Sequence, residues 1–174
     1  MNCSEIIKLR DEHNKEWKSE IEKEKEIGDQ LRATKTLTKS QLEEIIPWKF
    51  DCDGRIRANE LRLIKGINEQ ALKEKSTRVF NLDVDHDYER IELLRSFKKG
   101  IGVAVASVIL AFYDPENYCV FDFHIYQELF GERPDYTTDE YVKLLTVLRK
   151  EAKKCGVFTR DIEKAYYRKN CQRS

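Results

Sequence analysis

The sequence has few of the residues that interrupt helices. Its 174 residues include only seven glycines and three prolines. Such low counts argue against a disordered chain and against an all-β fold, which needs many tight turns. Apolar residues make up 40% of the chain, enough for a core, while charged residues reach 37%, well above the usual share of about a quarter. The length fits one domain, or one core with two lobes.

Paired cysteines and long apolar runs are also lacking. The five cysteines, an odd number, are widely spaced without a Cys-x-x-Cys pair, which suggests neither a disulfide framework nor a zinc site. The longest apolar stretch, residues 101–113, is too short and too interrupted to cross a bilayer. The first residues contain no apolar core of a signal peptide. We therefore expect a soluble cytoplasmic protein with reduced cysteines, no metal site and no membrane contact.

An excess of charge of either sign is absent too, because 32 Lys and Arg residues balance 32 Asp and Glu residues. This neutral sum argues against nucleic-acid binding only if the charge is evenly spread. It is not: residues 113–141 carry a net charge of −7, and residues 142–174 carry +7. In the basic block, Arg160 and Lys164 share one helical face. Such residues fit a track for phosphates, ion pairs with acidic neighbours or a solvated helix face, and the sequence leaves these interpretations open.

Helix signals dominate the sequence. Residues 4–27 have a thin apolar stripe and predict one charged helix that ends at Gly28. A capping box at Thr38 and Gln41 predicts a helix that ends before Pro47. Further helices are expected over residues 54–65, 68–79, about 89–97, about 103–112, 138–155 and 159–170. The prediction is an all-α fold of about eight or nine helices, with residues 1–36 as an N-terminal charged helix and residues 37–174 as the main domain.

The stretch most informative about function runs from Lys98 and Lys99 through Gly100, Ile101 and Gly102 into a helix of small residues. Two glycines around an apolar residue permit a tight turn and a close approach of the backbone to a ligand. The helix after the turn begins with free N–H groups at its positive end, which can bind a phosphate without reading base sequence. An ordinary helix–helix turn has the same pattern, so the motif needs further support.

A second motif follows at a fixed distance. Twenty residues after Gly102, Asp122 stands at the start of a helix after a short apolar run, and His124 comes two residues later. Together with the hairpin, this pattern resembles the helix-hairpin-helix DNA glycosylase superfamily, which includes endonuclease III and the adenine and alkyladenine glycosylases. The matching segments are residues 98–102, 106–110 and 121–125.

A group of small, mostly uncharacterised members of that superfamily is more similar still. The matches are Trp48-Lys49, Asp114-Pro115, Tyr118 and residues 159–165. The resemblance covers roughly residues 37–167. It implies a helical bundle or barrel whose hairpin, at about residues 89–112, contacts the DNA backbone through Lys98, Lys99, Gly100, Ile101 and Gly102.

The resemblance also implies that Asp122 is the catalytic carboxylate of a DNA glycosylase. Such an enzyme flips a damaged or modified nucleotide out of the duplex, and a carboxylate stabilises the oxocarbenium-like sugar and can activate water. The alternative role of Asp122 is that of a plain helix N-cap. Ala104 stands where bifunctional members carry a lysine nucleophile, so the implied enzyme is monofunctional and has no lyase activity.

Three further residues are candidates for the base pocket. Trp48 can stack on a flipped base or anchor the core. Lys49 can contact the pocket or extend to the surface. His124 can orient the turn that carries Asp122.

The expected partner is duplex DNA, damaged or abasic, bound by a monomer that would then be associated with the nucleoid. Only Cys155 and Cys171 lie near the C-terminus, so we expect no iron–sulfur cluster and no other cofactor. Two alternative functions remain open. One is a non-catalytic helix-hairpin-helix module that binds DNA, and the other is a structural or protein-interaction barrel.

Overall fold

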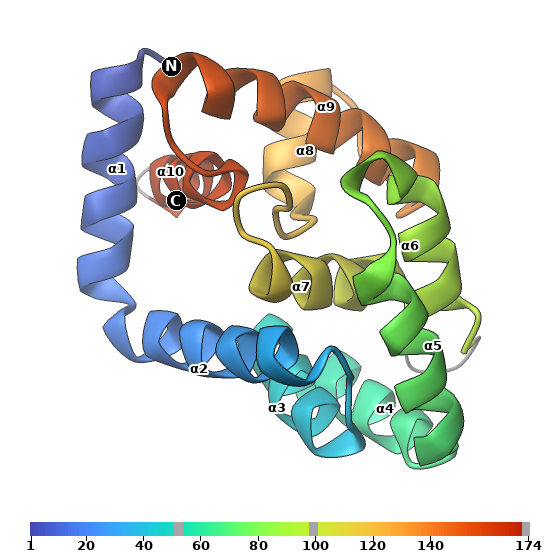
Figure 1. The fold of residues 1–174 in the computed structure, drawn as a ribbon. Coiled ribbons are helices and arrows are strands. Elements are labelled where there is room, and N and C mark those ends of the chain that lie inside the picture. Colours follow the sequence, from blue (N-terminus) through green and yellow to red (C-terminus); the bar gives the residue numbers. More distant parts are fainter. Residues whose placement is uncertain (51–53, 98–100, 172–174) are drawn as a thin grey trace.

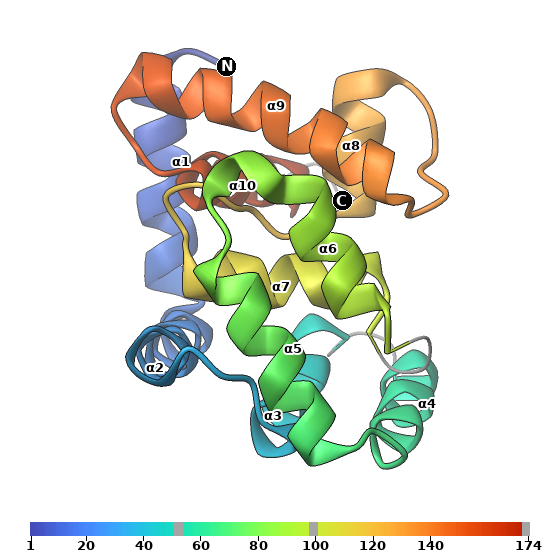
Figure 2. The same ribbon diagram turned by 45° about the vertical axis from the view of Figure 1, so that its right-hand side comes forward.

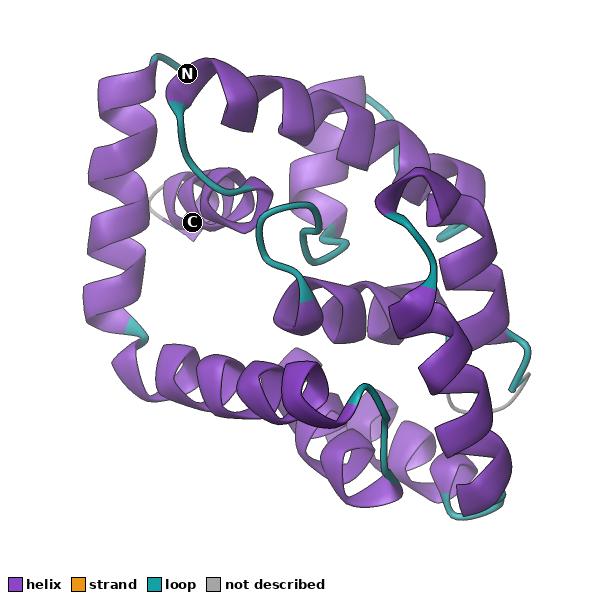
Figure 3. Cartoon of the chain, in the orientation of Figure 1, coloured by secondary structure: helices purple, strands orange, loops and turns teal. Residues whose placement is uncertain are grey.

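The computed structural model describes residues 1–50, 54–97 and 101–171, with the backbone alone for residues 54–57. All regular structure in these ranges is helical, as predicted (Figure 3). A short 3-10 helix, η1 (Val84–His86), precedes α6. The α-helices are α1 (Cys3–Glu16), α2 (Lys18–Thr34), α3 (Lys39–Lys49), α4 (Gly54–Ile64), α5 (Glu69–Asn81), α6 (Asp87–Arg95), α7 (Val103–Tyr113), α8 (Phe123–Phe130), α9 (Thr138–Cys155) and α10 (Thr159–Cys171).

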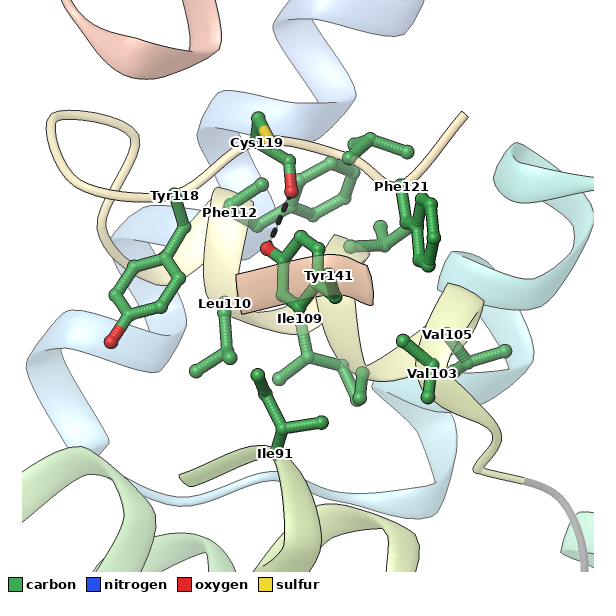
Figure 4. Packing of buried hydrophobic residues seen from close by; sticks show 14 of the residues in the cluster. Ile91, Val103, Val105, Ile109, Leu110, Phe112, Tyr118, Cys119, Phe121 and Tyr141 are labelled. Carbon is green, nitrogen blue, oxygen red and sulfur yellow. Dashed lines mark hydrogen bonds between the residues drawn. The ribbon is translucent and has the colours of Figure 1, made fainter. Parts of the chain in front are cut away.

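Helix α7 lies in the middle of the molecule (Figures 1 and 2). It has no charged residue, and nearly all of its side chains are buried. A helix that is apolar all round needs cover on every side, and α2, α3, α6 and α9 supply it. Figure 4 shows Ile109 and Leu110 of α7 beside Ile91 of α6 and Tyr141 of α9. The Tyr141 hydroxyl donates a 2.6 Å hydrogen bond to a backbone carbonyl there, so the one polar atom of this ring is satisfied.

The N-terminal region differs from the prediction of one helix ending at Gly28. The chain forms two helices, α1 and α2, which meet at a break at Trp17, and α2 continues through Gly28. A Cβ atom at Gly28 would lie 2.3 Å from the carbonyl oxygen of Phe112 in α7. Gly28 is therefore needed for the close approach of two helices rather than for a helix end. This extra break raises the number of α-helices above the predicted eight or nine, to ten within the described ranges.

Helix α3 also extends beyond its predicted end, because Pro47 lies inside it. Proline removes one helical hydrogen bond, but the N–H of Phe50 still donates to the carbonyl of Ile46 at 3.0 Å. The prediction that the helix ends before Pro47 is wrong. Its last turn carries Trp48 and Lys49.

The capping box predicted at Thr38 and Gln41 is confirmed by its reciprocal hydrogen bonds. Thr137 and Glu140 form the same reciprocal hydrogen bonds at the start of α9. Helix α9 ends at Gly156, which has a φ of 65°, a left-handed conformation that favours glycine. These elements could be predicted because each depends only on residues within one helical turn.

A disulfide joins Cys3, at the start of α1, to Cys155, at the end of α9. The expectation of reduced cysteines is wrong for this pair. The two residues are 152 positions apart, and the packing of α1 along α10 brings their Cα atoms to 5.2 Å. Cys119 is buried and free, and Cys171 is exposed and free. In the described ranges, we find no helix that is both long and apolar enough to span a bilayer.

Candidate functional site

A cavity of about 350 Å³ brings together residues that are far apart in the chain. It is lined by His13, Trp17, Glu20, Ile21, Trp48, Lys49, Val120, Asp122, His124, Arg160, Glu163 and Tyr167. Four of these residues, namely Trp48, Lys49, Asp122 and His124, are the candidates for the catalytic carboxylate and the base pocket. The structure therefore places these four around one cavity, although they come from α3, from α8 and from the segment before α8.

Asp122 is fixed at the start of α8 by its own side chain. Its Oδ1 atom accepts hydrogen bonds from the backbone N–H of His124 at 2.9 Å and of Ile125 at 3.2 Å. Asp122 is therefore a helix N-cap, one of its two predicted roles. Its Oδ2 atom has no hydrogen-bond partner among the described residues, and the half-buried side chain lines the cavity. A cap that uses one oxygen leaves the other available to a ligand.

His124 contributes its backbone N–H to the cap, while its side chain is exposed and its ring contacts that of Phe123 at 4.8 Å. Any residue except proline would supply this backbone N–H, so the role of the imidazole in orienting the turn stays a prediction.

The extended segment 119–122 is held by side chains from three helices. Ser107 of α7 and Glu163 of α10 each accept a backbone N–H of this segment, at 2.8 and 3.2 Å. Tyr141 of α9 donates to one of its carbonyls at 2.6 Å. All three side chains are buried. These bonds fix the backbone from which Asp122 projects, so the carboxylate has a defined position before any ligand binds.

Lys49 reaches the same segment from the last turn of α3. Its Nζ atom donates to the carbonyl oxygen of Phe121 at 3.0 Å. Burial lowers the pKa of Lys49, and the Asp122 carboxylate opposes this change. We call Trp48, Lys49, Val120 and Asp122 the carboxylate wall of the cavity.

Trp48 both lines the cavity and anchors α3. Its ring packs edge-on against Phe112, with centroids 4.8 Å apart. The guanidinium of Arg160 lies over the ring, 5.5 Å from its centroid. The anchoring role considered from the sequence is therefore present, and the ring also contributes to the cavity.

Another part of the lining was not predicted from the sequence, and it comes from α1, the break after it and α2. We call His13, Trp17, Glu20 and Ile21 the N-terminal wall. The rings of His13 and Trp17 are 4.7 Å apart. Burial, together with nearby cations on α10, lowers the pKa of His13 to about 3, so its imidazole is neutral near pH 7. Trp17 and Ile21 belong to the thin apolar stripe of residues 4–27, which was the local signal for this wall.

Buried ion pairs connect α10 to α2 beside the cavity. Arg160 pairs with Glu24 at 2.9 Å and also with Glu163, and Lys164 pairs with Glu24 at 3.3 Å. All four residues are at most 7% exposed. Of the interpretations left open for Arg160 and Lys164, ion pairing is confirmed, although the sequence did not indicate Glu24. Both side chains are buried, so little of their charge is exposed to phosphates.

Much of the remaining basic block is paired as well. Arg149 binds Asp87 of α6, Arg168 binds Glu16 at 2.7 Å, and Lys169 binds Glu128. Exposed lysines remain on α9, at positions 150, 153 and 154. The net charge of +7 therefore exaggerates the charge that this block offers to a polyanion, because most of it is neutralised within the molecule.

The hairpin before α7 is described only in part. Lys98, Lys99 and Gly100 lie outside the described residues. Ile101 is 3% exposed and belongs to the core, whereas Gly102 is exposed and is the N-cap of α7 without a side-chain cap. A Cβ atom at Gly102 would meet nothing within 4 Å, so the backbone there faces open space.

The described residues contain no group of three or more His, Cys, Asp or Glu side chains arranged to hold a metal ion. Comparisons with protein families, curated proteins and solved structures found no match to this chain. The function has to be argued from the site itself.

Proposed function

We propose that this chain has a helix-hairpin-helix glycosylase-like fold and hydrolyses the N-glycosidic bond of a damaged or modified base in DNA. The observation that carries the proposal is the position of Asp122. Its carboxylate is fixed by two backbone N–H groups, keeps its Oδ2 atom free of partners in the described part, and faces a cavity of about 350 Å³. Pockets for small ligands begin at about 300 Å³, so a single flipped base is an appropriate occupant.

In this proposal the carboxylate wall carries out the chemistry. The flipped base enters the cavity, and its sugar lies against Asp122. As the glycosidic bond breaks, the base leaves with the bonding electron pair and takes up a proton from solvent. Positive charge develops on the sugar ring, and the carboxylate stabilises it more strongly in a partly buried site than in water. Asp122 then accepts a proton from the water that attacks the anomeric carbon. Because the cap and the segment 119–122 are already fixed, little reorganisation is needed in the transition state.

The proposed contact with the DNA backbone lies at the hairpin between α6 and α7. The exposed start of α7 at Gly102 offers backbone N–H groups and the positive end of a helix dipole. Lys98 and Lys99 belong to the same proposed contact. Because much of the basic block is paired internally, we expect weak non-specific binding with a shallow dependence on salt.

The test is a panel of duplex oligonucleotides that carry uracil, oxoguanine, methyladenine or hypoxanthine, scored for new abasic sites. Asp122→Asn removes the charge but keeps an N-cap, because asparagine caps helices as well as aspartate does. Asp139→Asn, at an exposed position in the first turn of α9, is the matched control. We expect one base to be released by the wild type and by the control, and release to be lost in Asp122→Asn.

Other results would favour the other two functions. Binding to duplex or abasic DNA without release of any base would favour a non-catalytic DNA-binding module. Absence of DNA binding even at low salt would favour a structural or protein-interaction barrel. Equal release by the wild type and Asp122→Asn would contradict the catalytic role of Asp122.

A further inference from the structure

Among the described residues that line the cavity, Lys49 is the only lysine, and the proposed hydrolysis does not use it. Its Nζ atom makes one hydrogen bond, to the carbonyl oxygen of Phe121, the residue next to Asp122. The amine and the carboxylate therefore line the same space from two different elements, α3 and the start of α8. An amine and a carboxylate in one enclosed site can act as a nucleophile and a proton acceptor.

The surroundings of Lys49 favour its neutral form. Burial lowers the pKa of its amine, and the nearby guanidinium of Arg160 acts in the same direction. The carboxylate of Asp122 and the thiol of Cys119 oppose them without cancelling the effect. A lysine in such a site is neutral, and hence nucleophilic, in a larger fraction of molecules than a solvated lysine.

We propose that Lys49 captures an aldehyde in this cavity as an imine, and that the aldehyde is the open-chain sugar of an abasic site. In this step the bond between Nζ and the C1′ carbon forms, and the carbonyl oxygen leaves as water with the two amine protons. The step needs no oxidant or reductant. The choice of aldehyde rests on the proposed function, because base removal would generate an abasic sugar beside Lys49.

This inference changes one expectation from the sequence. Ala104 removes the lysine that bifunctional relatives carry in the helix after the hairpin, but the amine proposed here comes from the end of α3. It reaches the cavity only because α3 continues through Pro47. The absence of a lysine at position 104 therefore does not leave the site without an amine.

Lys164 provides an internal comparison. It is buried, whereas Lys49 is half-buried, and burial lowers the pKa of both amines. However, it is held by Glu24 at 3.3 Å and lines a smaller cavity, of about 160 Å³, in which Asp122 does not take part. If burial alone made a lysine reactive, Lys164 would react too.

The experiment is trapping with borohydride, which delivers a hydride to the imine carbon while the nitrogen takes a proton from solvent. Two aldehydes are used: a duplex oligonucleotide with a single abasic site, and free 2-deoxyribose 5-phosphate. Peptide mapping by mass spectrometry locates the adduct in the wild-type protein, so this readout needs no variant. Lys49→Arg keeps the cation but cannot form an imine, and Lys154→Arg, at an exposed position, is the matched control.

We expect the adduct on Lys49, a loss of at least about tenfold in Lys49→Arg, and no change in Lys154→Arg. An adduct on Lys49 with the sugar phosphate but not with DNA would support the reactive amine and contradict the proposed action on DNA. An adduct spread over exposed lysines, an adduct on Lys164, or no adduct would overturn the inference. If bases were nevertheless released from DNA, the proposed glycosylase function would stand without a reactive Lys49.

Discussion

The two walls of the cavity are built by different physical means. The carboxylate wall is fixed by short hydrogen bonds from buried side chains of the core, as the contacts of Ser107 and Tyr141 show. The N-terminal wall is fixed by contacts that join distant parts of the chain, namely the disulfide at Cys3 and the ion pairs of Glu24 with α10. The comparison indicates that the carboxylate wall can keep its shape when the N-terminal wall is loosened.

The largest effect is expected at Arg160, which lies over the Trp48 ring of the carboxylate wall and pairs with Glu24 of α2, the helix that carries Glu20 and Ile21 of the N-terminal wall. Arg160→Met would leave Glu24 and Glu163 buried without their main cation, at a cost of about 3–5 kcal/mol in the free energy of unfolding. Denaturation in urea measures this change. Lys154→Met removes an exposed cation as a control and should change stability little. A loss below about 1 kcal/mol in Arg160→Met would show that these ion pairs do not hold the walls together.

A somewhat smaller effect is expected from the disulfide, which acts on the N-terminal wall alone. Cys3→Ser should lower the free energy of unfolding by about 2–4 kcal/mol, because the bond closes a loop that spans most of the chain. Thermal unfolding with and without a thiol reductant measures it. The reductant should destabilise the wild type and leave the variant unchanged. If the reductant did not change the melting temperature of the wild type, the disulfide would have no role in stability.

The next largest effect on the free energy of unfolding is expected where α2 contacts the central helix α7. Gly28→Ala places a methyl group against a backbone carbonyl of α7 and should cost about 1–3 kcal/mol. Gly66→Ala is the control, since its nearest contact would be an ordinary 3.7 Å. Equal stability of the two variants, measured by urea denaturation, would mean that α2 does not approach α7 as closely as described.

The smallest effect is a pH dependence at His13. The pKa of His13 is about 6.5 in the unfolded chain and is lowered to about 3 in the folded protein. Between these two pH values the unfolded chain binds a proton at His13 and the folded protein does not. Stability should therefore fall as the pH falls, by about 1 kcal/mol between pH 6.5 and 5.5. Urea denaturation at both pH values should show this fall in the wild type and in His124→Gln, which alters an exposed histidine. A fall of the same size in His13→Gln would assign the effect to other groups.

The carboxylate wall was more predictable from the sequence than the N-terminal wall, for a physical reason. The N-cap at Asp122, the apolar α7 and both capping boxes depend on neighbours within a few residues, and periodicity and spacing reveal such neighbours. The partners of Cys3, Glu24 and Gly28 lie about 80 or more positions away. No local pattern identifies such a partner, because the packing of whole helices decides it.

Pro47 shows the same limit within a single helix. A proline signals a helix end locally, but the packing of Trp48 against Phe112 accompanies one more turn of α3. Trp48 and Lys49 were named as pocket candidates from a resemblance, and the turn that carries them to the cavity was not predicted.

The most direct test of the central claim, that Asp122 acts on the sugar of a nucleotide whose base is held in this cavity, is the single-turnover rate of base release from the responsive oligonucleotide. The rate in Asp122→Asn should be lower by at least about a hundredfold, with an unchanged melting temperature and unchanged affinity for DNA. A rate equal to that of the wild type would contradict the claim.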